Sequence, residues 1–568
     1  MSQHDQDDTS HPDADLEAGN GSDSSIAPLR IPTFRRLWIG LIIFNLGHLI
    51  LVVASSWLIL EITNSPFWVS LMVAAPTLPL LFLSLPAGAA ADLLNRRHVL
   101  VASSAMLGVA SLGMSLIWVL DMVTPGRLVG LGLAIGIGIA FFNPAWQAIV
   151  PSLVPSSLVP GAVSLNSATG GVATALGPAV GGLLVATVGP GWSFAVATVG
   201  YLSILLTTLA SKTLEWNKEK GSMSVAIATG LRYLRFSDNY LWLLLLGSLF
   251  GFTAAALRSM LPNITSDALG GDSALYGTLL GLFGAGALLG GLTRSIAGRA
   301  VGTRMIAVSI VAFGVSSGIV GVSTSVTLTG IAIAVAGLLW TWILSTLISI
   351  YQMLTPDWVR GRTMGAFILS VFGFMPLGSV TSGTLGDAIG ASGSLLVFSA
   401  GVMAVGLATF KMPIPILEHI EPPVVPEPII GNGVGDEPNA EAVMVTNTWT
   451  IAETEFEPFV EFLAELRRLR LKTGAYEWAV YRSAADLSRV TEVFMLHSWE
   501  QHLQQHRRLD VQALRTIARM RQFGDPESFV QSHWVEFDVD DPDKRPAWRD
   551  LLSEHEEFHL PHVSDPHR

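Results

Sequence analysis

The sequence predicts an all-α membrane protein with twelve transmembrane helices in two six-helix halves, followed by a small soluble α+β domain. Three observations carry this prediction. Of the 568 residues, 50% are hydrophobic and only 14% are charged, whereas soluble globular proteins carry about 25% charged residues. Long apolar runs follow one another from residue 37 to residue 412. The charges are segregated, because residues 30–411 carry a net +8 while the parts on either side are acidic.

Twelve apolar runs are each long enough to cross a hydrocarbon core of ~30 Å, which takes about 20 helical residues. The runs are 37–61, 67–93, 98–121, 127–150, 158–189, 192–211, 240–262, 274–297, 303–324, 326–354, 361–389 and 391–412. Lys and Arg accumulate in cytoplasmic loops, and of the eighteen in residues 30–411 only Arg127 and Arg258 fall on the outer side. We therefore expect a multi-pass protein of the plasma (inner) membrane with both termini in the cytoplasm.

Changes in composition divide the chain into seven parts. They are a disordered acidic tail (1–29), an N-terminal six-helix half (30–210), a cytoplasmic connection with an amphipathic helix (211–239), a C-terminal six-helix half (240–412), a Pro-rich linker (413–441), a soluble domain (442–540) and a polar tail (541–568). The strand and helix patterns of the soluble domain follow the order β-α-β-β-α-β, which suggests a small ferredoxin-like sandwich.

The two membrane halves repeat each other. The segment "LGPAVGGLLVATVG" (176–189) aligns with "LGSVTSGTLGDAIG" (377–390), 201 residues later. This offset fits two six-span halves in parallel repeat, with the charged segment 211–239 between them.

Composition also excludes several classes of function. A net charge of −12 argues against nucleic acid as a partner. The absence of cysteine excludes disulfides, thiolate metal sites and cysteine catalysis. We expect no cofactor and no metal, and the partners that remain are the lipid bilayer and a small amphipathic substrate.

The loop after the second span reads "GAAADLLNRR" and contains Gly88, Asp92, Arg96 and Arg97. It is similar to the signature G-x-x-x-D-[RK]-x-G-[RK]-[RK] of the major facilitator superfamily, with Leu93 and Asn95 departing from the pattern. The resemblance implies a conformational switch. Asp92 would face the positive N-terminus of a helix from the other half. The two arginines would form ion pairs across the same boundary between the halves. The alternative is that the arginines only anchor the topology.

The fifth span contains "GPAVGG", with Gly177, Pro178, Gly181 and Gly182. It resembles the core of a motif associated with exporters in the same superfamily. Glycines let neighbouring helices approach closely, and proline frees a carbonyl and bends a span. We expect these residues to form a hinge face that lies against the other half.

Three further segments, "NPAWQAIVPSLVPSSLVPGAVSLNSA" (143–168), "PDWVRGRTMGAF" (356–367) and "KTGAYEWAVY" (472–481), resemble the enterobactin-exporter-like, transmembrane secretion effector branch of major facilitators. The resemblance implies a secondary active transporter, not an enzyme. It would export siderophores, drugs or secreted metabolites by alternating access, in exchange for protons. The soluble domain resembles the dimeric α/β-barrel group that includes antibiotic-biosynthesis monooxygenases, which implies a homodimer through this domain.

Two other functions stay open at this point. The protein could be a membrane sensor or regulator gated by its soluble tail, or a monooxygenase that the spans tether to the membrane. Twelve spans are many more than an enzyme needs for attachment to a membrane, so we rank the tethered enzyme lowest.

Polar residues inside the spans are candidates for the substrate and proton pathway, because they are costly in a membrane. No carboxylate lies near the middle of any span. His48 either carries protons or is a satisfied buried histidine, and Arg258 meets an anionic substrate or, as we favour, lipid phosphate. In the soluble domain His502 and His506 have a spacing that can bind metal, but a solvated surface is favoured. The pathway candidates are Asn45, His48, Asn143, Gln147, Arg258 and Gln352.

Overall fold

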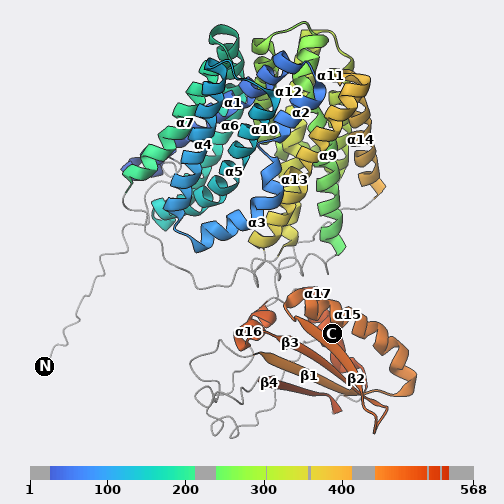
Figure 1. Cartoon of the computed structure of the whole chain (residues 1–568). Helices are drawn as coiled ribbons and strands as arrows, with labels where there is room; N and C mark the ends of the chain where they lie inside the picture. Colours follow the sequence, from blue (N-terminus) through green and yellow to red (C-terminus); the bar gives the residue numbers. More distant parts are fainter. Residues whose placement is uncertain are drawn as a thin grey trace, which may run out of the picture. The chain divides into compact units, whose positions relative to one another are not determined.

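The computed structural model describes residues 26–211, 238–301, 304–355, 360–411, 442–507, 511–524 and 528–535. They form a block of long helices and a C-terminal α+β domain, shown in Figure 1 and described here one at a time. The amphipathic segment (223–236), the Pro-rich linker (413–441) and most of both expected tails lie outside the described residues.

The N-terminal half contains six spans in seven helices. These are α1 (Pro32–Thr63), α2 (Pro66–Ala74), α3 (Leu78–Leu93), α4 (Arg96–Val119), α5 (Pro125–Ile149), α6 (Val159–Val188) and α7 (Pro190–Ala210). The sequence predicts one continuous second span, but the structure divides it into α2 and α3. Pro76 has no N–H to continue the helix, and Pro79 restricts the residue that precedes it.

The C-terminal half contains the other six spans. These are α9 (Asp238–Asp267), α10 (Ser273–Val301), α11 (Met305–Val322), α12 (Val326–Leu354), α13 (Arg360–Ile389) and α14 (Ala391–Lys411). The described residues thus contain twelve helical segments long and apolar enough to cross a membrane, which confirms the predicted number of spans.

Glycines set the distance between helices within each half. A β-carbon added at Gly200 of α7 would lie 2.9 Å from the carbonyl oxygen of Ile43 in α1. In the C-terminal half a β-carbon at Gly378 of α13 would meet the carbonyl of Phe252 in α9. Helices in lipid associate through close packing rather than through the hydrophobic effect, and residues without a side chain permit that packing.

The C-terminal domain is an antiparallel sheet with helices on one face (Figure 1). The strands are β1 (Val443–Thr450), β2 (Glu477–Arg482), β3 (Arg489–Leu496) and β4 (Val530–Val535), in the order β2-β3-β1-β4. Val445 of β1 pairs with Phe494 on one side and with His533 on the other. The helices are α15 (Phe456–Thr473), α16 (Trp499–Arg507) and α17 (Val511–Arg519).

Alternation along β1 shows which face is covered. Its residues are alternately buried and half-buried, because one face lies against the helices. Trp449 of β1 packs there edge-to-face with Phe459 of α15, with ring centroids 5.3 Å apart, and donates its indole N–H to the carbonyl of Met520. The order of strands and helices along the chain agrees with the pattern read from the sequence.

Candidate functional site

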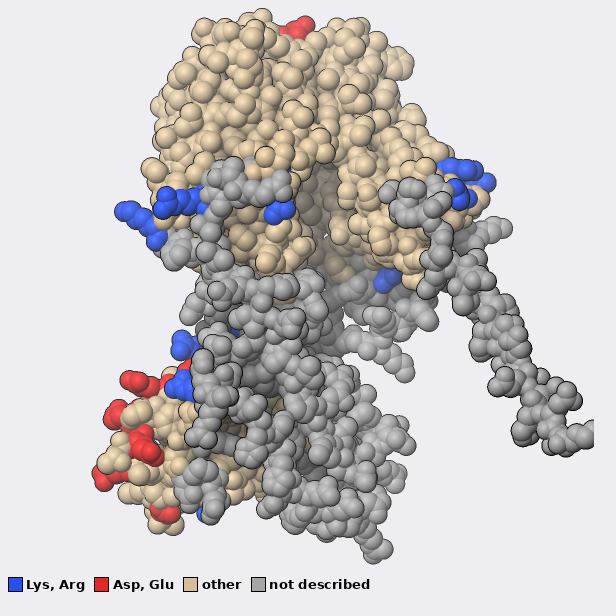
Figure 2. All heavy atoms as spheres, turned by 180° about the vertical axis from the view of Figure 1, so that it is seen from behind, with Lys and Arg blue, Asp and Glu red and all other residues tan. Residues whose placement is uncertain are grey.

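Basic side chains gather at one end of the helical block, as Figure 2 shows. We call this the basic end. Helices α1, α4 and α11 begin there and α14 ends there, and its described basic residues include Arg30, Arg35, Arg36, Arg96, Arg97, Arg304 and Lys411. The other end, at which α1, α9 and α13 finish, we call the opposite end.

A polar cleft of about 440 Å³ lies in the part of the N-terminal half nearer the basic end. The structure brings together three of the predicted pathway residues there, Asn45 from α1 and Asn143 and Gln147 from α5. Asn166 of α6 joins them and accepts a hydrogen bond of 2.8 Å from the indole Nε1 of Trp146. The amides donate and accept hydrogen bonds without carrying charge.

Asn166 is the lining residue that the sequence analysis missed. It lies within a segment quoted for its family resemblance, but it was not singled out as a polar group inside a span. Of the remaining candidates, Gln352 is exposed near the end of α12 and is not among the residues that line the cleft.

His48 lies one turn beyond Asn45 on α1 but serves a contact within the N-terminal half. Its Nδ1 lies 2.9 Å from the hydroxyl oxygen of Tyr201 in α7, and Tyr201 is fully buried. This hydrogen bond fixes the imidazole between two helices of the same half.

Arg258 is placed differently from our expectation. Lipid phosphate was favoured as its partner, but its side chain, although exposed, lines two small cavities of about 20 and 40 Å³ between the helices. The second is bordered by α1, α6 and α10, as the lining residues Val53, Pro178 and Phe283 show. The charge count in the loops treats every arginine alike, so it could not separate a topological anchor from a residue that faces the interior.

The glycine-rich motif of the fifth span faces two neighbours. β-Carbons added at Gly177 and Gly181 would lie 2.8 Å from the Cβ of Leu49 and 3.0 Å from the Cα of Ile50, both in α1 of the same half. A β-carbon at Gly182 would instead meet the carbonyl oxygen of Ser273 and lie 2.9 Å from the Cα of Gly277 in α10 of the other half. Only part of the motif therefore lies on the seam between the halves.

Pro178 adds a backbone group to the same seam. A proline cannot donate to the carbonyl four residues earlier, which here belongs to Thr174. That carbonyl oxygen lies where a β-carbon at Gly284 of α10 would be. Farther along, a β-carbon at Gly277 would meet the carbonyl of Pro178 itself. Backbone meets backbone between α6 and α10, without intervening side chains at these positions.

A second contact between the halves closes the opposite end. The carboxylate of Asp387, near the end of α13, accepts hydrogen bonds from the hydroxyl of Ser65 at 3.0 Å and from the backbone N–H of Phe67 at 3.1 Å. Ser65 is the N-cap of α2, so a negative charge from one half lies at the positive end of a helix in the other. The sequence analysis gave Asp387 no role, although the internal repeat passes through it.

The predicted switch motif lies where α3 ends and α4 begins. Arg96 donates from Nη1 to the carbonyl of Ala148 in α5, at 3.2 Å, and Arg97 donates to the carbonyl of Leu209 in α7, at 2.8 Å. Both of these bonds lie within the N-terminal half, not across the seam. A β-carbon at Gly88 would have no neighbour within 4 Å, and the side chain of Asp92 lies outside the described part of the structure.

Two six-helix halves that meet at the opposite end, with a polar cleft in the N-terminal half nearer the basic end, define a membrane transporter of the major facilitator type. The chain belongs to the transmembrane secretion effector family, whose model matches residues 23–536. The protein is therefore a major facilitator efflux transporter of small molecules, and membership of a transporter family implies that it is not an enzyme.

Similar proteins match about two thirds of the chain. The chain is 27% identical over 389 residues to the multidrug efflux pump Tap of Mycobacterium tuberculosis, covering 65% of this chain and 90% of Tap. It is 25% identical over 401 residues to the enterobactin exporter EntS of Citrobacter koseri, covering 70% of this chain and 95% of EntS. A solved bacterial homologue of the iron transporter ferroportin shares the fold, with a TM-score of 0.53, 16% identity, and coverage of 67% and 98% of the two chains.

The C-terminal domain holds a buried polar group that sequence reasoning did not find. Glu492 of β3 is fully buried and accepts hydrogen bonds from Asn447 Nδ2 at 2.6 Å and from Trp478 Nε1 at 2.8 Å. The guanidinium of Arg470 in α15 completes it with an ion pair of 3.3 Å. A buried charge needs such compensation.

The histidine pair on α16 is also not where we expected it. His502 is 2% exposed, so the favoured reading of a solvated surface is wrong. Its ring lies 4.8 Å from those of His506 and of His533 on β4, measured between centroids. Among the described residues no group of three or more His, Cys, Asp or Glu side chains is arranged to hold a metal ion.

Burial makes these imidazoles weak bases. It lowers the pKa of His502 to about 2, and the neighbouring His506, His533 and Arg470 add to the effect. The pKa of His506 is lowered to about 4 by burial and then by Arg470. Both rings are therefore neutral near pH 7.

Proposed function

We propose that this protein exports amphipathic small molecules of the drug or siderophore class from the cytoplasm, by alternating access and in exchange for protons. The observation that carries the proposal is the polar cleft nearer the basic end together with the closed seam at the opposite end. Relatives named as a multidrug efflux pump, an enterobactin exporter and a staphyloferrin A transporter support this substrate class.

The orientation follows from the distribution of Lys and Arg. Lys and Arg accumulate in cytoplasmic loops, so the basic end faces the cytoplasm. The cleft then opens to the compartment from which an exporter takes its substrate. We place the protein in the plasma (inner) membrane with both termini in the cytoplasm and keep the domain limits read from the sequence.

Substrate would enter through the cleft lined by Asn45, Asn143, Gln147 and Asn166. Neutral amides suit a transporter with several substrates, because each can act as donor or acceptor for different polar groups. Proton exchange is the drive we propose, and His48, an ionisable imidazole near the middle of a span, is the candidate proton carrier. Asp92, Arg96 and Arg97 would act as the switch at the basic end.

For the C-terminal domain we infer a ferredoxin-like sandwich that forms a homodimer. The strand order β2-β3-β1-β4 with antiparallel neighbours supports the fold. The described side chains on the sheet face away from the helices include Tyr481 and Trp534, which are 60% and 55% exposed. Large apolar side chains on one face support its use as an interface.

The test uses inverted membrane vesicles that contain the full chain and rhodamine 6G as the probe. We expect accumulation of the dye when a proton gradient is present and its loss when a protonophore collapses the gradient. Uptake that is unchanged by the protonophore would remove proton exchange from the proposal. Vesicles that accumulate no more dye than those without the protein would remove export of this dye class.

A pair of variants tests the pathway through the cleft. Gln147→Leu removes an amide that lines the cleft, whereas Gln352→Leu makes the same change at an exposed position outside it. We expect the first to lower the initial rate of uptake at least threefold, because one lost hydrogen bond is worth about 0.5–1.5 kcal/mol. The second should stay within the error of the wild type.

A further inference from the structure

We propose that Arg258 and Trp340 form a subsite that binds the anionic group of an aromatic substrate on its way through the transporter. The proposal rests on the export function above and names the class of substrate. The subsite lies beyond the polar cleft. The cleft is lined by Asn45 and Gly170, and the cavity at Arg258 by Leu49 and Thr174, four residues or about one helical turn farther along the same two helices.

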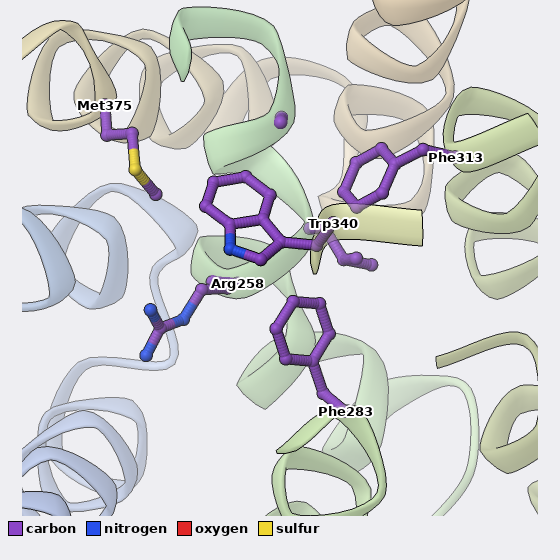
Figure 3. Close-up of a pocket in the computed structure, with 7 residues that line it drawn as sticks. Arg258, Phe283, Phe313, Trp340 and Met375 are labelled. Carbon is purple, nitrogen blue, oxygen red and sulfur yellow. The ribbon is translucent and has the colours of Figure 1, made fainter. Parts of the chain in front are cut away.

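Two hydrogen-bond donors point the same way. Figure 3 shows the guanidinium of Arg258 directed away from Phe313 and toward the pale blue ribbon of the N-terminal half. The indole nitrogen of Trp340 lies on that same side of its ring. Guanidinium and indole N–H groups donate and never accept. A ligand that meets both must therefore present acceptor atoms.

The charge of Arg258 has no counterpart among the residues that the structure describes. Among the described residues no carboxylate, hydrogen-bond acceptor or aromatic face is recorded as a partner of its guanidinium, and no acceptor as a partner of the Trp340 indole N–H. The titratable groups that act on Arg258 from neighbouring helices are Tyr276 and His48, neither of which is a carboxylate.

Arginine keeps its proton in proteins, and an uncompensated cation within the membrane block is costly. A bound anion offsets this cost. The resulting difference in free energy between the empty and the occupied subsite favours binding. The carboxylates that the structure describes in the membrane block lie at the ends of helices, as Glu61, Asp121, Asp267 and Asp387 do, and none of these lines the cavities at Arg258.

Aromatic rings form one part of the wall of the subsite, beside aliphatic residues such as Leu257 and Met375. The Trp340 ring lies 5.4 Å from that of Phe250, 6.1 Å from that of Phe313 and 6.4 Å from that of Phe283, between centroids. Phe283 lines both cavities at Arg258. At these distances the protein rings pack against one another, and the half-buried rings of Trp340 and Phe283 are the ones that a planar ligand can meet. The subsite thus selects a carboxylate, sulfonate or phenolate carried by an aromatic body.

Binding of two dyes with the same ring system tests the proposal on the purified full chain. Fluorescein carries negative charge and rhodamine 6G positive charge on a xanthene ring, and fluorescence anisotropy gives the dissociation constant of each. We expect Arg258→Gln to weaken fluorescein at least tenfold and to leave rhodamine 6G within twofold. Arg258→Lys should recover part of the loss, because the charge returns without the planar fork.

Further variants complete the design. Trp340→Phe keeps an aromatic ring, although a smaller one, and removes the N–H, and should weaken fluorescein about threefold or more. Arg127→Gln is the matched control, because Arg127 is exposed at the opposite end and donates to the carbonyl of Met122. It should change neither constant.

Equal weakening of both dyes by Arg258→Gln would overturn the subsite and assign the arginine a purely structural role. Fluorescein affinity unchanged in that variant would overturn it as well. Neither result contradicts the proposed export function, because the vesicle assay measures export with the cationic dye. Inorganic phosphate should displace fluorescein only at much higher concentration than unlabelled benzoate does, and equal potency of the two would overturn the aromatic part of the proposal.

Discussion

The carboxylate of Asp387 lies 3.1 Å from the backbone nitrogen of Phe67 and 3.0 Å from the hydroxyl oxygen of Ser65, so that the end of α13 is bonded to the beginning of α2. This contact joins the two halves at the opposite end. It combines an N-cap position with a charge at a helix N-terminus, and such contacts are worth about 1 kcal/mol in other proteins.

Asp387→Asn should therefore shift the protein toward the state that is open at the opposite end, by roughly fivefold for about 1 kcal/mol. The chain has no cysteine, so Ser70→Cys introduces a single thiol. Ser70 is fully buried, and a β-carbon at Gly383 of α13 would lie 2.6 Å from its Cβ. The rate at which a membrane-impermeant maleimide labels this thiol measures the opening.

The matched control is Asp267→Asn in the same Ser70→Cys background. Asp267 is exposed at the end of α9, at the same end of the block. Its change should leave the labelling rate alone. Equal acceleration by both variants would show that net charge, rather than the contact with α2, sets the equilibrium.

Gly182→Ala should impair closure of the opposite end. The added methyl group would meet the carbonyl of Ser273, and α6 and α10 would have to separate, which costs about 1–3 kcal/mol for an overpacked contact. Uptake of rhodamine 6G by inverted vesicles should fall at least fivefold. Gly291→Ala places the same methyl group on α10, where no atom lies within 4 Å, and should transport normally.

The C-terminal domain should lose stability as the pH falls. His502 and His506 have pKa values of about 2 and about 4 in the folded domain, against 6.5 in the unfolded chain. Above pH 6.5 both imidazoles are neutral in the folded and in the unfolded chain, so the free energy of unfolding is at its full value. Below pH 6.5 it declines, because the unfolded chain binds protons that the folded domain does not. At pH 5 each imidazole that stays neutral costs about 2 kcal/mol.

Hydrogen exchange of α16 in the full chain, measured between pH 7 and pH 5 and corrected for the intrinsic rate, reports this loss. His502→Phe removes one of the two groups and should flatten the pH dependence. The control is His497→Gln, since His497 is exposed and stacks on Tyr476. A pH dependence that survives in His502→Phe would place its origin elsewhere.

Glu492→Gln should destabilise the same domain by about 3–5 kcal/mol, because it leaves the guanidinium of Arg470 buried without its counter-charge. Glu465→Gln is the contrast. Its ion pair with Arg519 is 36–45% exposed, and exposed pairs contribute about 0–1 kcal/mol. Protease cleavage within β3 in the presence of increasing urea distinguishes the two variants. Similar midpoints would contradict the stated role of Glu492.

The membrane architecture could be predicted because its signals are local. Apolar runs of sufficient length mark each span, and their limits agree with the helices to within a few residues for most of them. The second span is the exception, because one helix is expected and the structure has two. Its run is continuous in hydropathy, but Pro76 and Pro79 interrupt the backbone between α2 and α3.

The site could be predicted only in part, since its remaining members depend on which side of a helix faces which neighbour. Asn143 and Gln147 are one turn apart and meet in the cleft as their spacing suggests. His502 was assigned to the wrong surroundings because spacing does not reveal burial, and the cavities that Arg258 lines could not be inferred from a count of charges. Asp387 was missed because its partner is a backbone N–H 320 residues away.

The approach of α6 to α10 has a consequence for how the two bundles part. At Gly182, Gly277 and Gly284 the surfaces that touch are peptide groups, so nothing has to change rotamer when they separate. At these three glycines the helices can separate without rearranging interdigitated side chains. The barrier to separation there depends on the backbone carbonyls, which lose one apolar neighbour and gain another. Substitutions on the lipid-facing sides of both helices should leave that barrier unaltered.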